Sequence, residues 1–124
     1  AGIIGTAKGK TIVTLTECVN TGDVTLITTN TSAHYGVSAF ATRTDNESSV
    51  FTLDKCVNTG VLTSATAPAN DAIAVPLKSG AAVATNCTYS SGTSTIAGAT
   101  KVDAAAAEAA IAAIEAKGGK VEKL

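Results

Sequence analysis

The chain has 124 residues, of which 45% are hydrophobic but only 3% aromatic, and its formal net charge at pH 7 is −1. A chain of this length predicts a single domain, residues 1–124, whose core is built mainly from alanine and valine. Because the charges are few and form no basic stripe, we expect no nucleic-acid partner. No apolar stretch approaches the roughly 18 residues of a membrane-spanning helix, so we expect no membrane insertion.

An N-terminal arm, residues 1–10, precedes a body that contains an internal repeat. Segment 12–26 reads IVTLTECVNTGDVTL, segment 50–64 reads VFTLDKCVNTGVLTS, and the two align without a gap. Each copy alternates threonine with aliphatic residues and then carries Asn-Thr-Gly, a turn sequence in which asparagine and glycine tolerate positive φ. Each copy therefore predicts a β-hairpin, in which a second strand returns antiparallel to the first.

The rest of the β body, residues 11–98, predicts further strands. Their ranges in chain order are 35–43, 73–77, 81–88 and 93–97. Pro76 places its strand at a sheet edge or a strand end, because proline cannot donate to a β-ladder. Strands spaced by about 8–12 residues favour an antiparallel sandwich or a barrel-like body.

The C-terminal segment changes from a strand pattern to a helix pattern. Residues 100–117 are rich in alanine, begin with a capping-box sequence at Thr100–Asp103, and end before Gly118. Residues 120–124 predict a terminal strand. The predicted fold class is α+β: a mainly antiparallel β sandwich or barrel-like body with a duplicated hairpin unit and one C-terminal Ala-rich helix.

No motif for chemistry stands out, so the sequence predicts no enzyme, no cofactor and no metal site. Segment 5–11 (GTAKGKT) is one residue short of a Walker A loop and precedes a predicted strand. The single histidine, His34, lies in no nucleophile motif, and Asp45 with Glu47 is much shorter than an EF-hand loop. These residues are more typical of a basic arm, a loop histidine and a solvated turn.

Cys18, Cys56 and Cys87 lack the paired spacing of a zinc site. One interpretation is three buried free thiols that pack as small hydrophobic side chains. The alternative is a disulfide between Cys18 and Cys56, because these two occupy equivalent positions in the repeat.

The two chain ends are candidate assembly arms. A short exposed strand at either end could pair with the sheet edge of a neighbouring chain through main-chain hydrogen bonds. The arm residues are Ala1, Gly2, Ile3 and Ile4 at one end and Val121, Glu122, Lys123 and Leu124 at the other. We therefore expect a non-enzymatic structural subunit: a virion decoration or cement protein that binds copies of itself or a larger capsid or tail lattice.

Two other functions fit the same sequence features. An extracellular or cell-surface filament subunit, pilus-like and assembled by strand donation, would require a cleaved leader and favour the disulfide. A small ligand- or glycan-binding module would require the few aromatic residues to gather on the surface. Ala1 fits either a clipped initiator methionine, which we favour, or the end of a cleaved leader.

Overall fold

The structure is a computed structural model that describes residues 2–29, 36–65 and 69–122. These residues form one helix, α1 (Ala104–Glu115), and a series of short strands. The strands are β1 (Ile12–Thr16), β2 (Val19–Asn20), β3 (Val24–Leu26), β4 (Gly36–Ser38), β5 (Ala41–Thr44), β6 (Val50–Asp54), β7 (Val57–Asn58), β8 (Leu62–Ser64), β9 (Ala69–Asp71), β10 (Ala74–Lys78), β11 (Ala81–Thr85), β12 (Cys87–Tyr89) and β13 (Ala99–Lys101).

Every strand pairing within the described ranges is parallel, so the expected antiparallel sandwich or barrel-like body is wrong. The duplicated hairpin is also wrong. β1 pairs with β6 from Ile12↔Val50 to Thr16↔Asp54, and β3 pairs with β8. Each strand of the first copy therefore lies beside its counterpart in the second copy, and the strands within one copy do not pair with each other.

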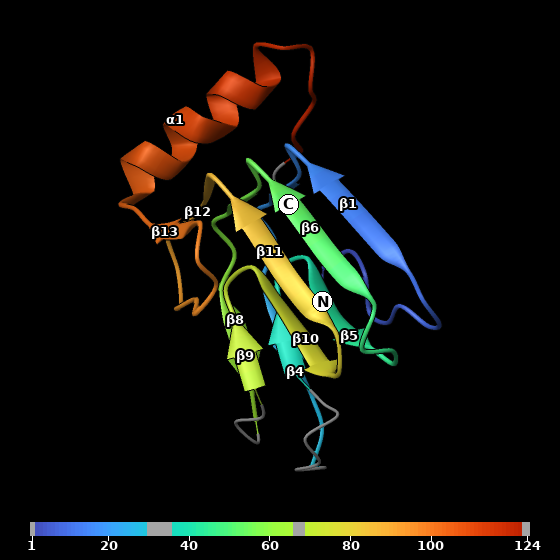
Figure 1. Ribbon diagram of the computed structural model, residues 1–124. Helices are drawn as coiled ribbons and strands as arrows, with labels where there is room; N and C mark the ends of the chain where they lie inside the picture. Colours follow the sequence, from blue (N-terminus) through green and yellow to red (C-terminus); the bar gives the residue numbers. More distant parts are fainter. Residues whose placement is uncertain (1, 30–35, 66–68, 123–124) are drawn as a thin grey trace.

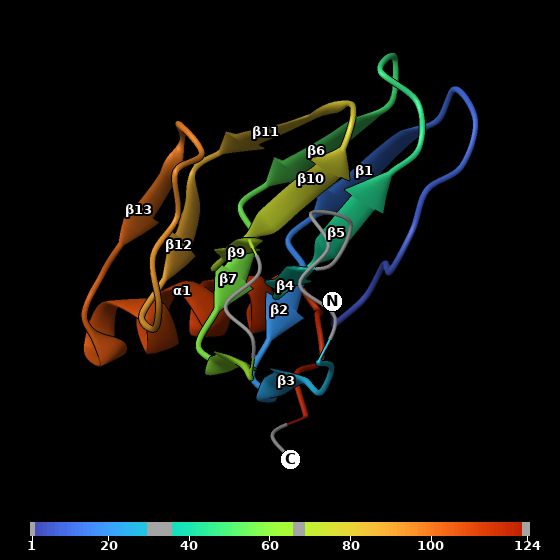
Figure 2. The same ribbon diagram turned by 90° about the horizontal axis from the view of Figure 1, so that it is seen from below.

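The parallel strands stack because the chain winds in coils. The strand orders are β1-β6-β11, β10-β5, β13-β12-β7-β2, β3-β8 and β4-β9. The coil β1–β5 therefore supplies one strand to each sheet, the coil β6–β10 lies on it and supplies a second, and β11 and β12 begin a third coil. The result is a short parallel β-solenoid, in which a repeat buries its apolar face against the next repeat. Figures 1 and 2 show the β1-β6-β11 layer facing the β5-β10 layer across the core.

One residue at the same place in each coil turns the chain between sheets. Glu17, Lys55 and Asn86 follow β1, β6 and β11 directly, and their φ angles are 51°, 53° and 52°. This left-handed conformation is uncommon for residues with a Cβ, and single residues of this kind redirect a chain sharply. Because all three coils make the same corner, the next strands, β2, β7 and β12, also come into register.

The core lies inside the coils. Phe40, Phe51, Leu53 and Ile73 are its largest fully buried apolar side chains. A partly buried polar contact continues the stacking, because the Nδ2 of Asn20 donates to the Oδ1 of Asn58, 38 residues later, at 2.8 Å. Both asparagines belong to the repeated CVNTG sequence, so that repeat specifies contacts between coils.

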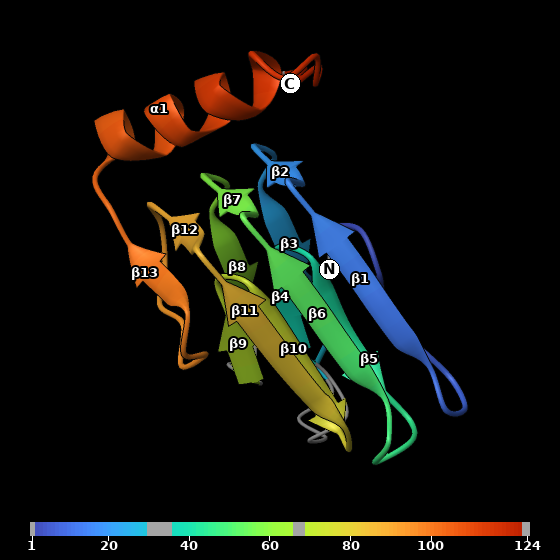
Figure 3. The ribbon, with the colours of Figure 1, turned by 45° about the horizontal axis from the view of Figure 1, so that its top comes forward.

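The helix α1 lies across the outer side of β7 and β12 (Figure 3). Ala107 and Ile111 are buried there against Val57. The helix begins at Ala104 after the N-cap Asp103, whereas Thr100 belongs to β13. The sequence predicts a terminal strand for residues 120–124. Residues 120–122 form no strand, and residues 123–124 lie outside the described part of the chain.

Candidate functional site: the open edge of β1

The first strand, β1, has a hydrogen-bonded neighbour on one side only within the described residues (Figure 3). The N–H of Glu17 donates to the carbonyl of Asp54 at 2.8 Å, and the carbonyl of Thr11 accepts from Val50 at 3.0 Å. Alternate residues of a strand face the same neighbour, so the odd-numbered residues of β1 direct their backbone groups toward β6. The backbone N–H and C=O groups of Ile12, Thr14 and Thr16 therefore point away from β6, toward the open edge of the sheet.

The side chains of β1 carry no charge: three are aliphatic and two are threonines. Val13 and Leu15 face inward and are only partly buried against the core. Ile12, Thr14 and Thr16 face outward, and Ile12 is 72% exposed. An edge strand without charge, proline or bulge is a ready template for pairing with another chain, because its unpaired N–H and C=O groups can bond to a neighbouring strand.

The comparable five-residue edges carry protection that β1 lacks. The edge strand β10 contains Pro76, and its register with β5 shifts between Ala74 and Leu77. The other edge of the β1-β6-β11 sheet is β11, where Gly98 packs so closely that a Cβ on it would collide with the Ala84 carbonyl oxygen. Natural sheets use proline, bulges and covering segments to block edge pairing. Among these strands, β1 is thus the one left open.

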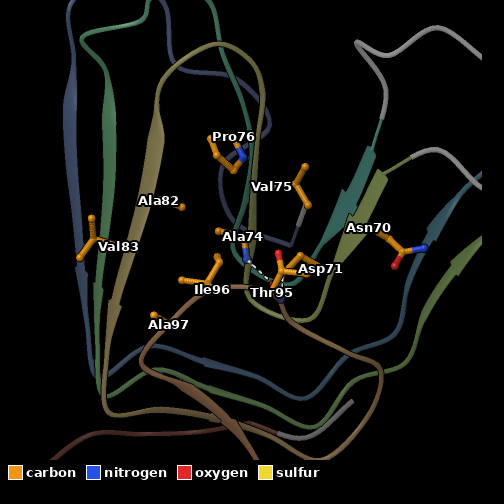
Figure 4. A pocket seen from close by; sticks show the side chains of 10 residues that line it. All are labelled: Asn70, Asp71, Ala74, Val75, Pro76, Ala82, Val83, Thr95, Ile96 and Ala97. Carbon is orange, nitrogen blue, oxygen red and sulfur yellow. Dashed lines mark hydrogen bonds between the residues drawn. The ribbon is translucent and has the colours of Figure 1, made fainter.

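A cavity of about 510 Å³ lies at the opposite end of the solenoid (Figure 4). Ala74, Ala82 and Ile96 form apolar parts of its lining, and Asp71 is the carboxylate beside it. Asp71 is 4% exposed and accepts hydrogen bonds from the backbone N–H groups of Ile73 and Thr95, both at 2.9 Å. The carboxylate therefore fastens the segment that closes this end of the coil.

The predicted N-terminal assembly arm already pairs within its own chain. Gly2 donates to the carbonyl of Ala39 at 2.9 Å, and Ile4 donates to that of Phe40 at 2.8 Å. The side chain of Ile3 is 49% exposed. Gly2 and Ile4 thus lie beside β5, in a partial coil that precedes the coil beginning at β1, and Ala1 lies outside the described residues. A role for this arm in assembly stays a prediction.

The predicted C-terminal arm lies near α1 and β2. Val121 packs against the cluster around Ile111, and the Glu122 carbonyl accepts a long hydrogen bond of 3.5 Å from the Oγ1 of Thr21. Lys123 and Leu124 are outside the described residues, so the assembly role of this segment also stays a prediction.

The three cysteines form one column, because each directly follows a corner residue in its coil. All three are free thiols; Cys56 and Cys87 are buried and Cys18 is half-buried. The hydrogen bond from Cys56 lowers the pKa of Cys87, while the same contact and burial raise the pKa of Cys56. The predicted Cys18–Cys56 disulfide is not formed here and stays a prediction, and the stacking brings Cys87 equally beside Cys56.

The motifs that resembled chemical sites have structural surroundings. Thr11 donates through its Oγ1 to the Lys8 carbonyl at 2.7 Å, so the Walker-like segment forms a turn into β1. Asp45 pairs with Arg43 at 2.9 Å. His34 lies outside the described residues. In the described ranges, no group of three or more acidic, histidine or cysteine side chains is placed to hold a metal ion.

Comparisons with protein-family models, curated proteins and solved structures find no match for this chain. Within the part of the chain described here, no helix is long and apolar enough to cross a membrane. The candidate site therefore depends on the geometry of β1. Sequence reasoning placed assembly at the chain ends and missed this edge; its only sequence signal is the uncharged run IVTLT.

Proposed function

We propose that this chain is a non-enzymatic structural subunit that joins neighbouring chains by pairing the open edge of β1 with a strand of the neighbour. The observation that carries the proposal is a five-residue edge that is unpaired among the described residues and has no charged side chain. Main-chain pairing supplies affinity whatever the neighbour's side chains are, and alternate side chains add specificity.

The energetics favour pairing at this edge. Each backbone hydrogen bond contributes about 0.5–1.5 kcal/mol net, and the exposed groups of Ile12, Thr14 and Thr16 can each form such bonds. A neighbouring strand would also cover the partly exposed Val13 and Leu15, adding about 25 cal/mol for each Å² of apolar surface removed from water. Together these terms oppose the entropy cost of association.

The setting that we propose is a virion, where the subunit would decorate or cement a capsid or tail lattice. A nearly neutral chain with an accessible strand edge can bind to other protein subunits through that edge. An open filament needs a different free edge at each end of the subunit. Because Gly98 covers part of the β11 edge, the geometry favours a closed cluster over the filament alternative.

A charge placed on the edge tests the proposal. In Thr14→Lys the ammonium lies beside the backbone groups at the open edge of β1. We expect this variant to lose association while it keeps its fold. Thr52→Lys is the matched control, because Thr52 pairs with Thr14 in register but lies on the central strand β6. The measurement is the molar mass by light scattering on a sizing column.

Each result decides the role of the edge. A wild-type mass above that of one chain, retained in Thr52→Lys and lost in Thr14→Lys, supports edge pairing. A wild-type chain that remains monomeric up to millimolar concentration, or an assembly that Thr14→Lys leaves intact, contradicts the proposal. Circular dichroism of both variants verifies that the fold is retained.

A further inference from the structure

We infer that the neighbour is a second copy of this chain, and that the two β1 strands pair antiparallel about a two-fold axis at Thr14. The inference rests on the proposed function and specifies its partner, register and symmetry. It predicts one continuous sheet with the strand order β11-β6-β1-β1-β6-β11 across two chains.

The alternation of backbone N–H and C=O groups along β1 supports this register. β1 has five residues, and the groups that point outward belong to the first, the middle and the last. Antiparallel pairing centred on Thr14 places it opposite the partner's Thr14, and Ile12 opposite the partner's Thr16. In an antiparallel ladder, residues at such positions exchange both of their N–H···O bonds. All the outward groups of one strand therefore meet matching groups of the other.

The side chains fit the same arrangement. A two-fold axis perpendicular to the sheet keeps the inner face of both chains on the same side. Val13 then lies opposite the partner's Leu15, and each covers an aliphatic side chain that is only partly buried in the single chain. Because β1 contains no charged residue, the like-charge repulsion that destabilises some cross-strand pairs does not arise.

The alternative pairings leave the edges less well satisfied. Parallel pairing of β1 with the β11 of another copy would require the outward groups of Ala82 and Ala84, and Gly98 packs against the Ala84 carbonyl. Pairing between two β11 strands meets the same obstacle twice. The β1–β1 pairing uses an edge that has no hydrogen-bonded neighbour within the described residues, and it closes after two copies, because a two-fold interface is satisfied by one partner.

Single-cysteine cross-linking tests the register. Thr14→Cys places two thiols directly opposite each other, at a Cα separation of about 5.5 Å, within the range that a disulfide spans. We expect a covalent dimer under mild oxidation with copper phenanthroline, read by non-reducing gel and mass spectrometry. Ile12→Cys alone and Thr16→Cys alone should remain uncross-linked, whereas their mixture should form a heterodimer. The oxidised wild-type chain controls for the native cysteines.

The outcomes separate this inference from the proposed function. Cross-linking of Thr14→Cys and of the mixed pair, with a two-chain mass, supports the two-fold register. If Thr14→Lys abolishes association but Thr14→Cys does not cross-link, edge pairing stands and the two-fold register is overturned. Cross-linking of Ile12→Cys or Thr16→Cys to itself in place of Thr14→Cys would also overturn it. If Thr14→Lys has no effect on association, both proposals fail.

Discussion

At the residue scale, Asp71 shows how a buried charge stabilises the end of the solenoid. One carboxylate oxygen accepts from the N–H of Ile73 at 2.9 Å, and the other accepts from the N–H of Thr95 at 2.9 Å. Because Asp71 and Thr95 are 24 residues apart, these bonds fasten the closing segment to the body. A buried acceptor with several backbone donors cannot be replaced by a donor group without leaving N–H groups unpaired.

We therefore expect Asp71→Asn to lower the free energy of unfolding by about 1.5–3 kcal/mol, the range for hydrogen bonds to charged groups. Urea unfolding followed by circular dichroism measures the change. Asp23→Asn is the matched control, because Asp23 also accepts a backbone N–H, from Val61 at 2.9 Å, but is exposed. Equal losses in the two variants would show that burial of Asp71 has no special role.

Single residues also mark what the sequence could reveal. The repeat CVNTG was visible, and the structure uses it for the contact between Asn20 and Asn58. The corner residues Glu17, Lys55 and Asn86 were not predictable, because three different residue types adopt the same left-handed conformation. Their shared backbone geometry is imposed by the stacking of coils, and of the three only Asn86 is a residue type that often adopts it.

At the element scale, α1 was the most predictable element and the hairpins the least. Alanine-rich sequence favours a helix through its own backbone preference, so the prediction needed no tertiary contact. A strand, a turn and a second strand occur both in a hairpin and in a solenoid coil. The local pattern is the same, and only the register between distant copies, such as Val24↔Leu62, distinguishes the two folds.

The N-cap of α1 gives a prediction at this scale. The carboxylate of Asp103 accepts from the N–H of Ala106 at 2.7 Å, and the alanine-rich first turn has no acidic residue to replace it. We expect Asp103→Ala to destabilise the protein by about 1 kcal/mol and Asp103→Asn to retain most of the stability, since asparagine is also a good N-cap. Urea unfolding measures the free energy of unfolding of both variants. An unchanged value for Asp103→Ala would mean that the cap contributes nothing to stability.

At the scale of the whole molecule, the prediction of a β-rich body with one C-terminal helix was right in content and wrong in topology. An uninterrupted repeat indicates stacked coils as readily as duplicated hairpins, and no short-range property decides between them. The same limit applies to the candidate site. The run IVTLT is uncharged in the sequence, but its place at the outside of a sheet follows from the strand order alone.

A closed two-chain assembly makes thermal stability depend on concentration. Association that favours the folded chain raises the melting temperature as the protein concentration rises. A tenfold increase in concentration is worth about 1.4 kcal/mol per dimer, which corresponds to a few degrees for chains of this size. We expect this shift in the wild-type chain and in Thr52→Lys, and a melting temperature independent of concentration in Thr14→Lys. Differential scanning calorimetry at several concentrations measures it. A wild-type melting temperature that does not change with concentration would mean that β1 pairing adds nothing to the stability of the folded protein.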